Sequence, residues 1–298
     1  MSLFEGSGVA MVTPMNKNGS INYDKLEELI ERQIEEHTDA LFICCTTGEA
    51  ATMTEEEHIG TIRFAVNRVK GRIPVIAGTG SNNTSQAVQM SIYAEKAGAD
   101  GVLLVTPYYN KATQKGMEAH FSTIAKSIKL PAILYNVPGR TGCSLSPQTI
   151  AHLVKNIDNI VGVKEASGNI SLVAQIMNLC DGNIDLYSGN DDQIIPILSL
   201  GGKGVVSVLS NIVPRYVHDM TTSYFSGNTT KAAKMQLDCI PLCNALFCEV
   251  NPIPAKTALN IMGFGACSLR MPLSDIEPQN YEIVKKALND FKKIYNFN

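Results

Sequence analysis

The stretch that decides the fold starts at Gly101. Residues 101–105 read Gly-Val-Leu-Leu-Val, residues 106–110 read Thr-Pro-Tyr-Tyr-Asn, and a helix-like pattern follows up to about Ile128. The apolar run is continuous and does not alternate with polar residues, which is typical of a strand buried on both faces of a parallel sheet. The predicted unit is therefore a buried strand, a polar strand end and a helix.

The same unit recurs on both sides of this stretch. Thr54 and Glu57 predict a capping box at the start of one of its helices, and Gly98 predicts the end of another. Eight such units within about 225 residues match a (β/α)8 TIM barrel, which typically has ~250 residues. The other seven apolar runs lie at residues 8–14, 40–45, 74–77, 131–134, 160–163, 185–187 and 204–209.

Near Asn228 the pattern changes to helices without strands between them. We therefore predict an α/β fold in two parts: a catalytic (β/α)8 barrel over residues 1–227 and a C-terminal helical domain over residues 228–298. A doubly wound open sheet is the alternative. It is disfavoured because Gly78-Thr79-Gly80 lacks the third glycine of a nucleotide-binding turn. The three predicted C-terminal helices lie at residues 231–246, 254–262 and 277–295.

Composition and charge exclude several classes of protein. The 298 residues are 45% apolar and 18% charged with a net charge of −3, which argues against disorder and against nucleic-acid binding. No apolar run approaches the ~18 residues of a membrane helix. The first residues lack the pattern of a secretory signal, and Cys44 and Cys45 lie inside an apolar run. We therefore expect a reduced, cytoplasmic protein.

The active site of a (β/α)8 barrel lies at the C-terminal ends of its strands. None of the five histidines lies on a predicted strand or in the two residues after one. A Ser-His-Asp triad and a His-ligated zinc are therefore disfavoured, and we predict no metal site. Asp191 and Asp192 after the seventh run would repel a phosphate group. The polar strand ends supply Thr46, Thr47, Glu49, Tyr108, Tyr109, Tyr135, Arg140, Lys164, Ser188 and Asp191.

Lys164 is the strongest candidate among these residues. It follows Ile-Val-Gly-Val in a buried strand, and lysine is rarely buried without a partner. One interpretation is a structural ion pair with Glu49 or Asp191. The other is catalytic: burial disfavours the ammonium form and exposes the lone pair that attacks a carbonyl carbon to form a Schiff base. That chemistry requires neither a metal nor a histidine.

Schiff-base chemistry requires a proton shuttle, and a phenol can serve as one. Tyrosines at or just after the strand runs are candidates, although packing is the alternative for each and the preferred role for Tyr187. Thr46 and Thr47 fit a proton relay or a carboxylate site, or only a turn. Arg140 presents a guanidinium fork to a carboxylate, or else forms a surface ion pair.

Together these motifs resemble those of the dihydrodipicolinate synthase family of pyruvate-dependent class I aldolases. They occur in the family's order and span the barrel. Sialic-acid and keto-deoxy-sugar lyases of the same superfamily share the lysine and one tyrosine, whereas the Tyr108–Tyr109 pair and Arg140 resemble the synthase. The matching motifs are Thr-Thr-Gly-Glu (46–49), Gly-Thr-Gly-Ser-Asn (78–82), Thr-Pro-Tyr-Tyr-Asn (106–110), Tyr-Asn-Val-Pro-Gly-Arg-Thr-Gly (135–142), Gly-Val-Lys-Glu-Ala (162–166) and Ser-Gly-Asn-Asp (188–191).

The resemblance implies a catalytic group of four residues. Lys164 forms a Schiff base with pyruvate, so that no separate cofactor is required. Tyr135 donates and accepts protons and is linked through Thr46 to Tyr109. In the family, the tyrosine that matches Tyr109 comes from a neighbouring subunit. The resemblance therefore also implies a homo-oligomer, commonly a homotetramer.

The resemblance also implies the substrates. Thr47 holds the carboxylate of pyruvate, Arg140 receives the carboxylate of L-aspartate 4-semialdehyde, and backbone near Gly189 and Val206 completes the pocket. The product enters lysine and diaminopimelate synthesis. The alternatives are another pyruvate-lysine aldolase, such as an N-acetylneuraminate or keto-deoxy-sugar lyase, and a catalytically silent barrel. The silent barrel is disfavoured because Lys164 and Tyr135 are both present.

One departure from the family concerns feedback inhibition by lysine. In lysine-sensitive relatives a glutamate that receives the amine of the inhibitor stands where this chain has Gln86, and Ala50 and Glu55 also differ. A neutral amide pairs with a cation less well than a carboxylate does, so we predict weak or absent inhibition. The positions that correspond to the allosteric site are Ala50, Ala51, Glu55, His58, Asn82, Gln86 and Tyr108.

Overall fold

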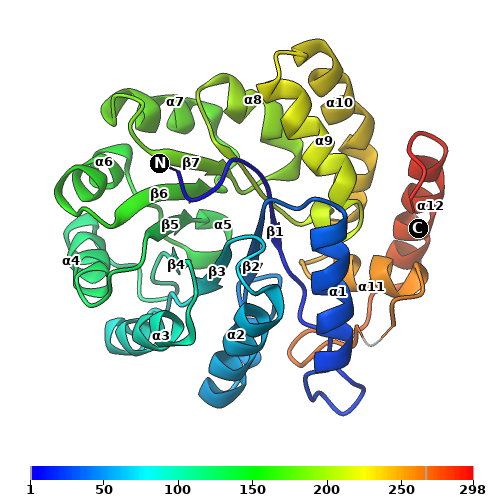
Figure 1. Ribbon diagram of the computed structural model, residues 1–298, viewed down its shortest axis with the longest axis horizontal. Coiled ribbons are helices and arrows are strands. Elements are labelled where there is room, and N and C mark those ends of the chain that lie inside the picture. Colours follow the sequence, from blue (N-terminus) through cyan, green and yellow to red (C-terminus); the bar gives the residue numbers. More distant parts are fainter. Residues whose placement is uncertain (1, 266, 298) are drawn as a thin grey trace.

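The computed structural model describes residues 2–265 and 267–297. Its centre is a closed barrel of eight parallel strands, in which each strand pairs with its neighbours in sequence and β1 closes on β8 (Figure 1). The prediction of a (β/α)8 barrel is thereby confirmed. The strands are β1 (Gly6–Ala10), β2 (Ala40–Ile43), β3 (Val75–Gly78), β4 (Gly101–Val105), β5 (Ala132–Asn136), β6 (Ile160–Glu165), β7 (Asp185–Ser188) and β8 (Gly204–Ser207).

Helices between the strands form a ring around the barrel (Figure 1). The capping box at Thr54 is present, since its side chain accepts from the Glu57 amide while the Glu57 side chain accepts from the Thr54 amide. Gly98 ends its helix as predicted, with φ of 85°. The helices of the ring are α1 (Tyr23–Glu35), α2 (Glu55–Val69), α3 (Thr84–Ala97), α4 (Gln114–Ala125), α5 (Pro138–Thr141), α6 (Pro147–Asn156), α7 (Ile170–Leu179), α8 (Ile194–Ser199) and α9 (Pro214–Phe225).

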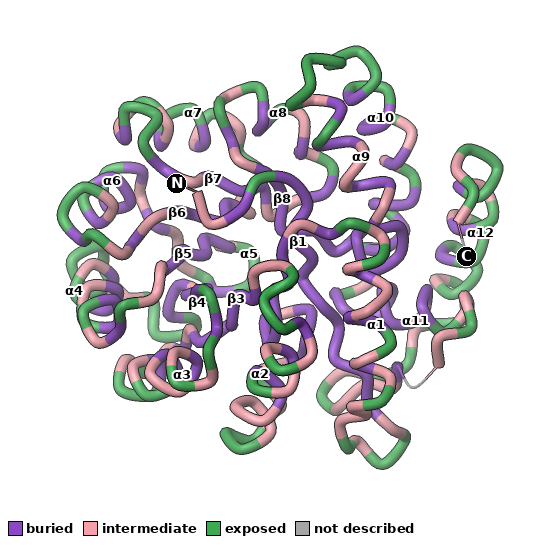
Figure 2. Tube along the Cα trace, viewed as in Figure 1, coloured by how far each residue is buried: buried purple, intermediate pink, exposed green. Residues whose placement is uncertain are grey.

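Two apolar layers hold this architecture together. One fills the barrel interior and includes Phe42, Ile76, Leu103, Ile133 and Tyr187. The other lies between the outer faces of the strands and the ring of helices, and Figure 2 shows the strands buried and the outer faces of the helices exposed. Burial on both faces explains why the strand runs are continuously apolar.

The strand ends differ from the predicted runs in two informative places. β5 continues through Tyr135 to Asn136 and β6 through Lys164 to Glu165, so the predicted catalytic side chains lie within strands. In contrast, the first run was predicted to reach Pro14, but β1 ends at Ala10. Beyond it the Val12 amide donates to the Asn211 side chain and not to a neighbouring strand.

Three helices follow the ring: α10 (Thr229–Ala245), α11 (Ile253–Ile261) and α12 (Pro278–Lys292). They lie on one side of the barrel, where α10 packs on α9 and α12 packs on α10 and α11 (Figure 1). The division at residues 227 and 228 stays a prediction, and the outer limits, residues 1 and 298, lie outside the described residues. None of the helices in the described ranges is both long enough and apolar enough to cross a membrane.

Candidate active site

Lys164 and Tyr135 lie side by side on neighbouring strands of the barrel. They are register partners in the β5–β6 pair, and the Lys164 Nζ lies 4.4 Å from the centre of the Tyr135 ring. Tyr135 belongs to the interior layer, and only 5% of the surface of Lys164 is exposed. The amine therefore lies in a largely apolar setting with a phenol beside it, as a Schiff-base lysine requires.

The two carboxylates considered as structural partners of Lys164 have other partners. Glu49 forms an ion pair with Lys256, so the alternative of a Lys164–Glu49 pair is wrong. Asp191 Oδ2 accepts from the backbone amides of Val208 and Leu209 at 3.0 and 2.9 Å. Within the part of the chain that the structure describes, no carboxylate forms an ion pair with Lys164, although the charge of Lys164 acts to lower the pKa of Asp191 against the larger opposing effect of burial.

A buried hydrogen-bond network fixes the register of these two strands. The Asn136 side chain donates to Glu165 Oε2 at 2.8 Å, and the Ser167 amide donates to Glu165 Oε1 at 2.7 Å. Burial raises the pKa of the Glu165 carboxyl, and these hydrogen bonds oppose that shift. The network lies one residue beyond Tyr135 and Lys164 and so holds the two side chains opposite each other.

A cavity of about 440 Å³ opens next to this pair. Thr46, Tyr135 and Arg140 line it, as the predicted roles require. The wall also contains all the predicted allosteric positions except Asn82, whose side chain donates to the Tyr108 carbonyl at 3.2 Å. The predicted catalytic and inhibitor-binding positions therefore adjoin one another in a single chain.

Asn251, which the sequence interpretation missed, joins two predicted carboxylate-binding residues. Its side-chain amide donates to Thr47 Oγ1 at 2.9 Å, and its backbone carbonyl accepts from Arg140 Nη2 at 3.1 Å. Arg140 is thus held by a carbonyl, and among the described residues it forms no surface ion pair of the kind considered as its alternative. The only sequence signal was an Asn-Pro step in front of a predicted helix, and it does not indicate which residues Asn251 contacts.

Besides Asn82, five predicted site residues do not line the cavity within one chain. Lys164 and Thr47 are buried, with 5% and 2% of their surface exposed. Tyr109 is 90% exposed. Val206 is buried in the interior layer. Gly189 is required by packing, because a Cβ there would lie 2.5 Å from the Ala166 Cβ.

Tyr187, for which packing was the preferred role, does pack. Its ring stacks on Phe4 with ring centres 4.3 Å apart, and its hydroxyl donates to the Phe4 carbonyl at 2.9 Å. Burial raises the pKa of this phenol, so it is a poor proton shuttle.

A second cavity and a metal centre are the alternatives to this site. A cavity of about 610 Å³ lies between α1 and the C-terminal residues, with Arg32 and Phe264 in its wall, but none of the predicted site residues lines it. Among residues 2–265 and 267–297, no group of three or more His, Cys, Asp or Glu side chains is arranged to hold a metal ion. The chemistry therefore centres on the cavity beside Lys164.

The geometry agrees with the comparison to known families. The model of the Dihydrodipicolinate synthetase family matches residues 3–291. The chain belongs to this family. Membership was predicted from the motifs and is confirmed over nearly the whole chain.

Individual members of the Dihydrodipicolinate synthetase family align with almost the whole of this chain. A curated 4-hydroxy-tetrahydrodipicolinate synthase from a Thermoanaerobacter species is 56% identical over 291 residues, which are 98% of each chain. A chloride-inhibited dihydrodipicolinate synthase from Acinetobacter baumannii, solved with pyruvate, is 41% identical with a TM-score of 0.94 and covers 96% of this chain and 98% of its own. The enzyme from Cyanidioschyzon merolae, solved with lysine bound, is 38% identical with a TM-score of 0.95, covering 98% and 99%.

Proposed function

We propose that this chain is a 4-hydroxy-tetrahydrodipicolinate synthase, a lyase that condenses pyruvate with L-aspartate 4-semialdehyde through a Schiff base on Lys164. The observation that carries the proposal is the buried Lys164 amine beside the Tyr135 ring, next to a cavity at the C-terminal ends of the strands. The names of the curated relatives support the same activity.

The steps balance with the groups in this cavity. The Lys164 amine attacks the keto carbon of pyruvate, and loss of water leaves an iminium. Loss of a methyl proton gives an enamine, whose carbon attacks the aldehyde carbon of the semialdehyde. The amine of that second substrate then displaces Lys164 and closes the ring. Tyr135 is the group that takes and returns the protons, and Thr46 in the cavity wall is its relay.

The two carboxylates of the substrates are assigned to different depths. Thr47 is buried in the turn after β2 and binds the carboxylate of pyruvate, which enters first. Arg140 is an exposed residue in the cavity wall and binds the carboxylate of the semialdehyde. A guanidinium at the rim suits a short carboxylated aldehyde better than a polyhydroxylated sugar, which favours the synthase over a sugar lyase.

Tyr109 completes the site from a second copy of the chain in this proposal. Its side chain is 90% exposed, and its backbone lies in the left-handed region with φ of 73°. In a monomer nothing would offset the free-energy cost of holding a large aromatic side chain in that conformation and exposing it to solvent. We therefore assign the chain to a homo-oligomer, a tetramer by the family's pattern, that works in the cytoplasm, where its eight free cysteines stay reduced.

Trapping with borohydride tests the proposal. Incubation with pyruvate and borohydride should add a reduced three-carbon adduct to Lys164 alone, located by mass analysis of the peptides. Lys164→Met should show no adduct and no turnover, while Lys203→Met, which removes a surface lysine, should behave as wild type. Supplying L-aspartate 4-semialdehyde separates a synthase from a lyase. An unmodified Lys164 would overturn the mechanism.

A further inference from the structure

The turn that carries Thr46 and Thr47 is held from behind by the C-terminal part of the chain. Glu49, at the end of this turn, forms an ion pair with Lys256 of α11, and the side chains of both residues are only 1% exposed. Glu49 Oε2 also accepts from the Arg270 backbone amide at 3.1 Å, and Lys256 Nζ donates to the Ser268 carbonyl at 2.8 Å. Two buried charges thus join segments that are about 200 residues apart in sequence.

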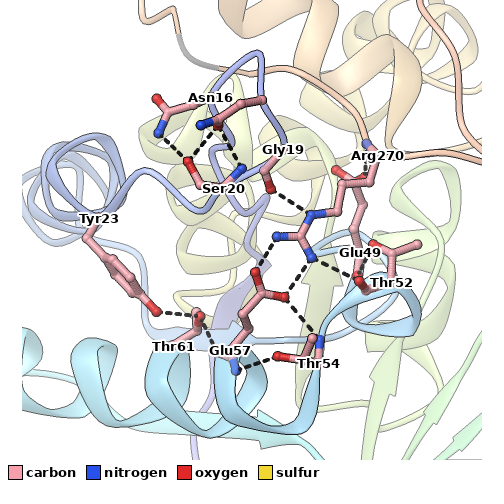
Figure 3. Close-up of polar contacts among 11 residues, drawn as sticks. Asn16, Gly19, Ser20, Tyr23, Glu49, Thr52, Thr54, Glu57, Thr61 and Arg270 are labelled. Carbon is pink, nitrogen blue, oxygen red and sulfur yellow. Dashed lines mark hydrogen bonds and ion pairs between the residues drawn. The ribbon is translucent and has the colours of Figure 1, made fainter.

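Arg270 extends this attachment to the next two elements (Figure 3). Its guanidinium donates to the Thr52 carbonyl at 2.9 Å and forms an ion pair with Glu57, the capping residue of α2. It also donates to the Gly19 carbonyl at 2.7 Å. The end of the turn, the short helix η1 (Ala50–Thr52) and the start of α2 are therefore all tied to one residue of the C-terminal segment.

The backbone conformation of Glu49 indicates that this attachment also fixes the shape of the turn. Glu49 has φ of 56° and ψ of 33°, a left-handed conformation that costs a glutamate free energy. Its amide donates to the Thr46 carbonyl at 3.1 Å, which closes the turn. Such a conformation persists where the surroundings determine it, and here the carboxylate is held by Lys256 and by the Arg270 amide.

A gain in folding stability does not by itself explain why a buried Glu49–Lys256 ion pair is present. Moving two charges out of water costs about as much free energy as their attraction returns, and neutral replacements of buried pairs are often as stable. Lys256 does not compete with Lys164 as a nucleophile either. Its amine is occupied by the Glu49 carboxylate and the Ser268 carbonyl.

We propose that Glu49 and Lys256 are positioning residues: their buried ion pair sets the turn so that Thr46 and Thr47 meet pyruvate. Glu49 forms part of the cavity wall, but its carboxylate is buried and held by Lys256, so it acts through the turn and not on the substrate. This inference rests on the proposed function for its kinetic consequence. Without the pair, Glu49 keeps only the Arg270 amide on its side chain. The left-handed conformation is then less well maintained, the turn relaxes, and the hydrogen bond from Thr47 to the carboxylate of pyruvate weakens.

The test uses the full chain with Glu49→Gln, Lys256→Met and the double variant. We expect each single variant to raise the pyruvate concentration that half-saturates trapping on Lys164, and the KM for pyruvate, about tenfold, equivalent to about 1.4 kcal/mol. The double variant leaves no unpaired charge, so it should recover thermal stability but keep the weak binding of pyruvate. Leu153→Ala is the control: it removes buried side-chain atoms from the core at α6. It should lower the melting temperature and leave pyruvate binding unchanged.

A second readout does not depend on activity. Amide hydrogen exchange of the peptide spanning residues 45–53 should become faster in the two single variants and in the double variant, and not in Leu153→Ala. If Lys256→Met does not fold, Glu49→Gln and the double variant decide the question. If wild-type protein forms no pyruvate adduct, the proposed function is wrong. The hydrogen-exchange data would then still show whether the Glu49–Lys256 pair holds the turn in place. Variants that lose only melting temperature, with normal pyruvate binding and normal exchange, overturn the inference.

Discussion

Two lysines are buried near the mouth of the barrel, and their neighbours give them different chemistry. Lys256 has a carboxylate and a carbonyl on its amine, and burial lowers its pKa while Glu49 opposes that shift. The Lys164 amine instead lies over the ring of Tyr135. A nucleophile requires a lone pair that is not engaged elsewhere, so at the residue scale the partners, and not burial alone, single out Lys164.

Gln86 provides a prediction at the same scale. It lines the cavity and accepts a hydrogen bond from Ser81 Oγ at 2.8 Å through its neutral amide. We expect millimolar lysine to inhibit the wild-type chain weakly. Gln86→Glu should lower the half-inhibitory concentration by about tenfold, because a hydrogen bond to a charged acceptor is roughly twice as strong. Initial rates at fixed pyruvate measure this effect, with Gln86→Met as the uncharged control. Half-inhibition of wild type by micromolar lysine contradicts the prediction.

At the scale of elements, the loops after β2 and β4 differ from the rest of the barrel mouth. Cys44 and Glu49 in the first loop, and Tyr109 and Lys111 in the second, all have positive φ although none is glycine. Strained backbone of this kind gathers at functional sites, where the surrounding structure maintains it. The two loops carry the predicted proton relay, which fits that pattern.

The start of α2 offers a prediction that separates stability from catalysis. Thr54 Oγ1 accepts from the Glu57 amide at 3.2 Å, and removing such a cap costs about 1 kcal/mol. We expect Thr54→Ala to lower the free energy of unfolding by that amount, measured in urea at fixed protein concentration, with pyruvate trapping unchanged. Thr54→Ser keeps the cap and should match wild type. Equal losses for the two variants would show that the hydroxyl is not the cause.

At the scale of the whole molecule, the proposed site is incomplete in a single chain. Tyr135 and Thr46 line one cavity and Lys164 lies beside Tyr135, whereas Tyr109 extends into solvent. A two-fold symmetric pair of chains would bring the same surface of each copy to the other. The oligomer is therefore part of the proposed chemistry and not only of the proposed assembly.

Mixed oligomers test that arrangement. Tyr109→Phe and Lys164→Met chains should each be nearly inactive by themselves. When the two are co-expressed, random mixed dimers contain one intact site formed by Lys164 of one chain and Tyr109 of the other, so about a quarter of the wild-type activity should return. Sedimentation checks that the oligomer forms in each sample. Co-expressed chains that associate but stay inactive would place Tyr109 outside the partner's site.

Local sequence patterns predict the strand–helix alternation, the caps and the strand-end positions of Lys164 and Tyr135. These features are local: each depends on residues a few positions apart, so periodicity and capping patterns reveal them. The barrel follows from the repeats because eight buried parallel strands with helical crossovers have few ways to close. The family followed from motifs that are each contiguous in the chain.

Only the tertiary structure decided what surrounds those residues. Asn251 donates to Thr47, which lies 204 positions away in sequence. Lys256, near the other end of the chain, pairs with Glu49. Position 189 must be glycine because a Cβ there would clash with the Ala166 Cβ. Nothing in the neighbouring sequence of Asn251 or Lys256 marks these partners. Contacts between distant segments depend on how the C-terminal helices pack on the barrel, and that packing is a property of the whole chain and not of any stretch within it.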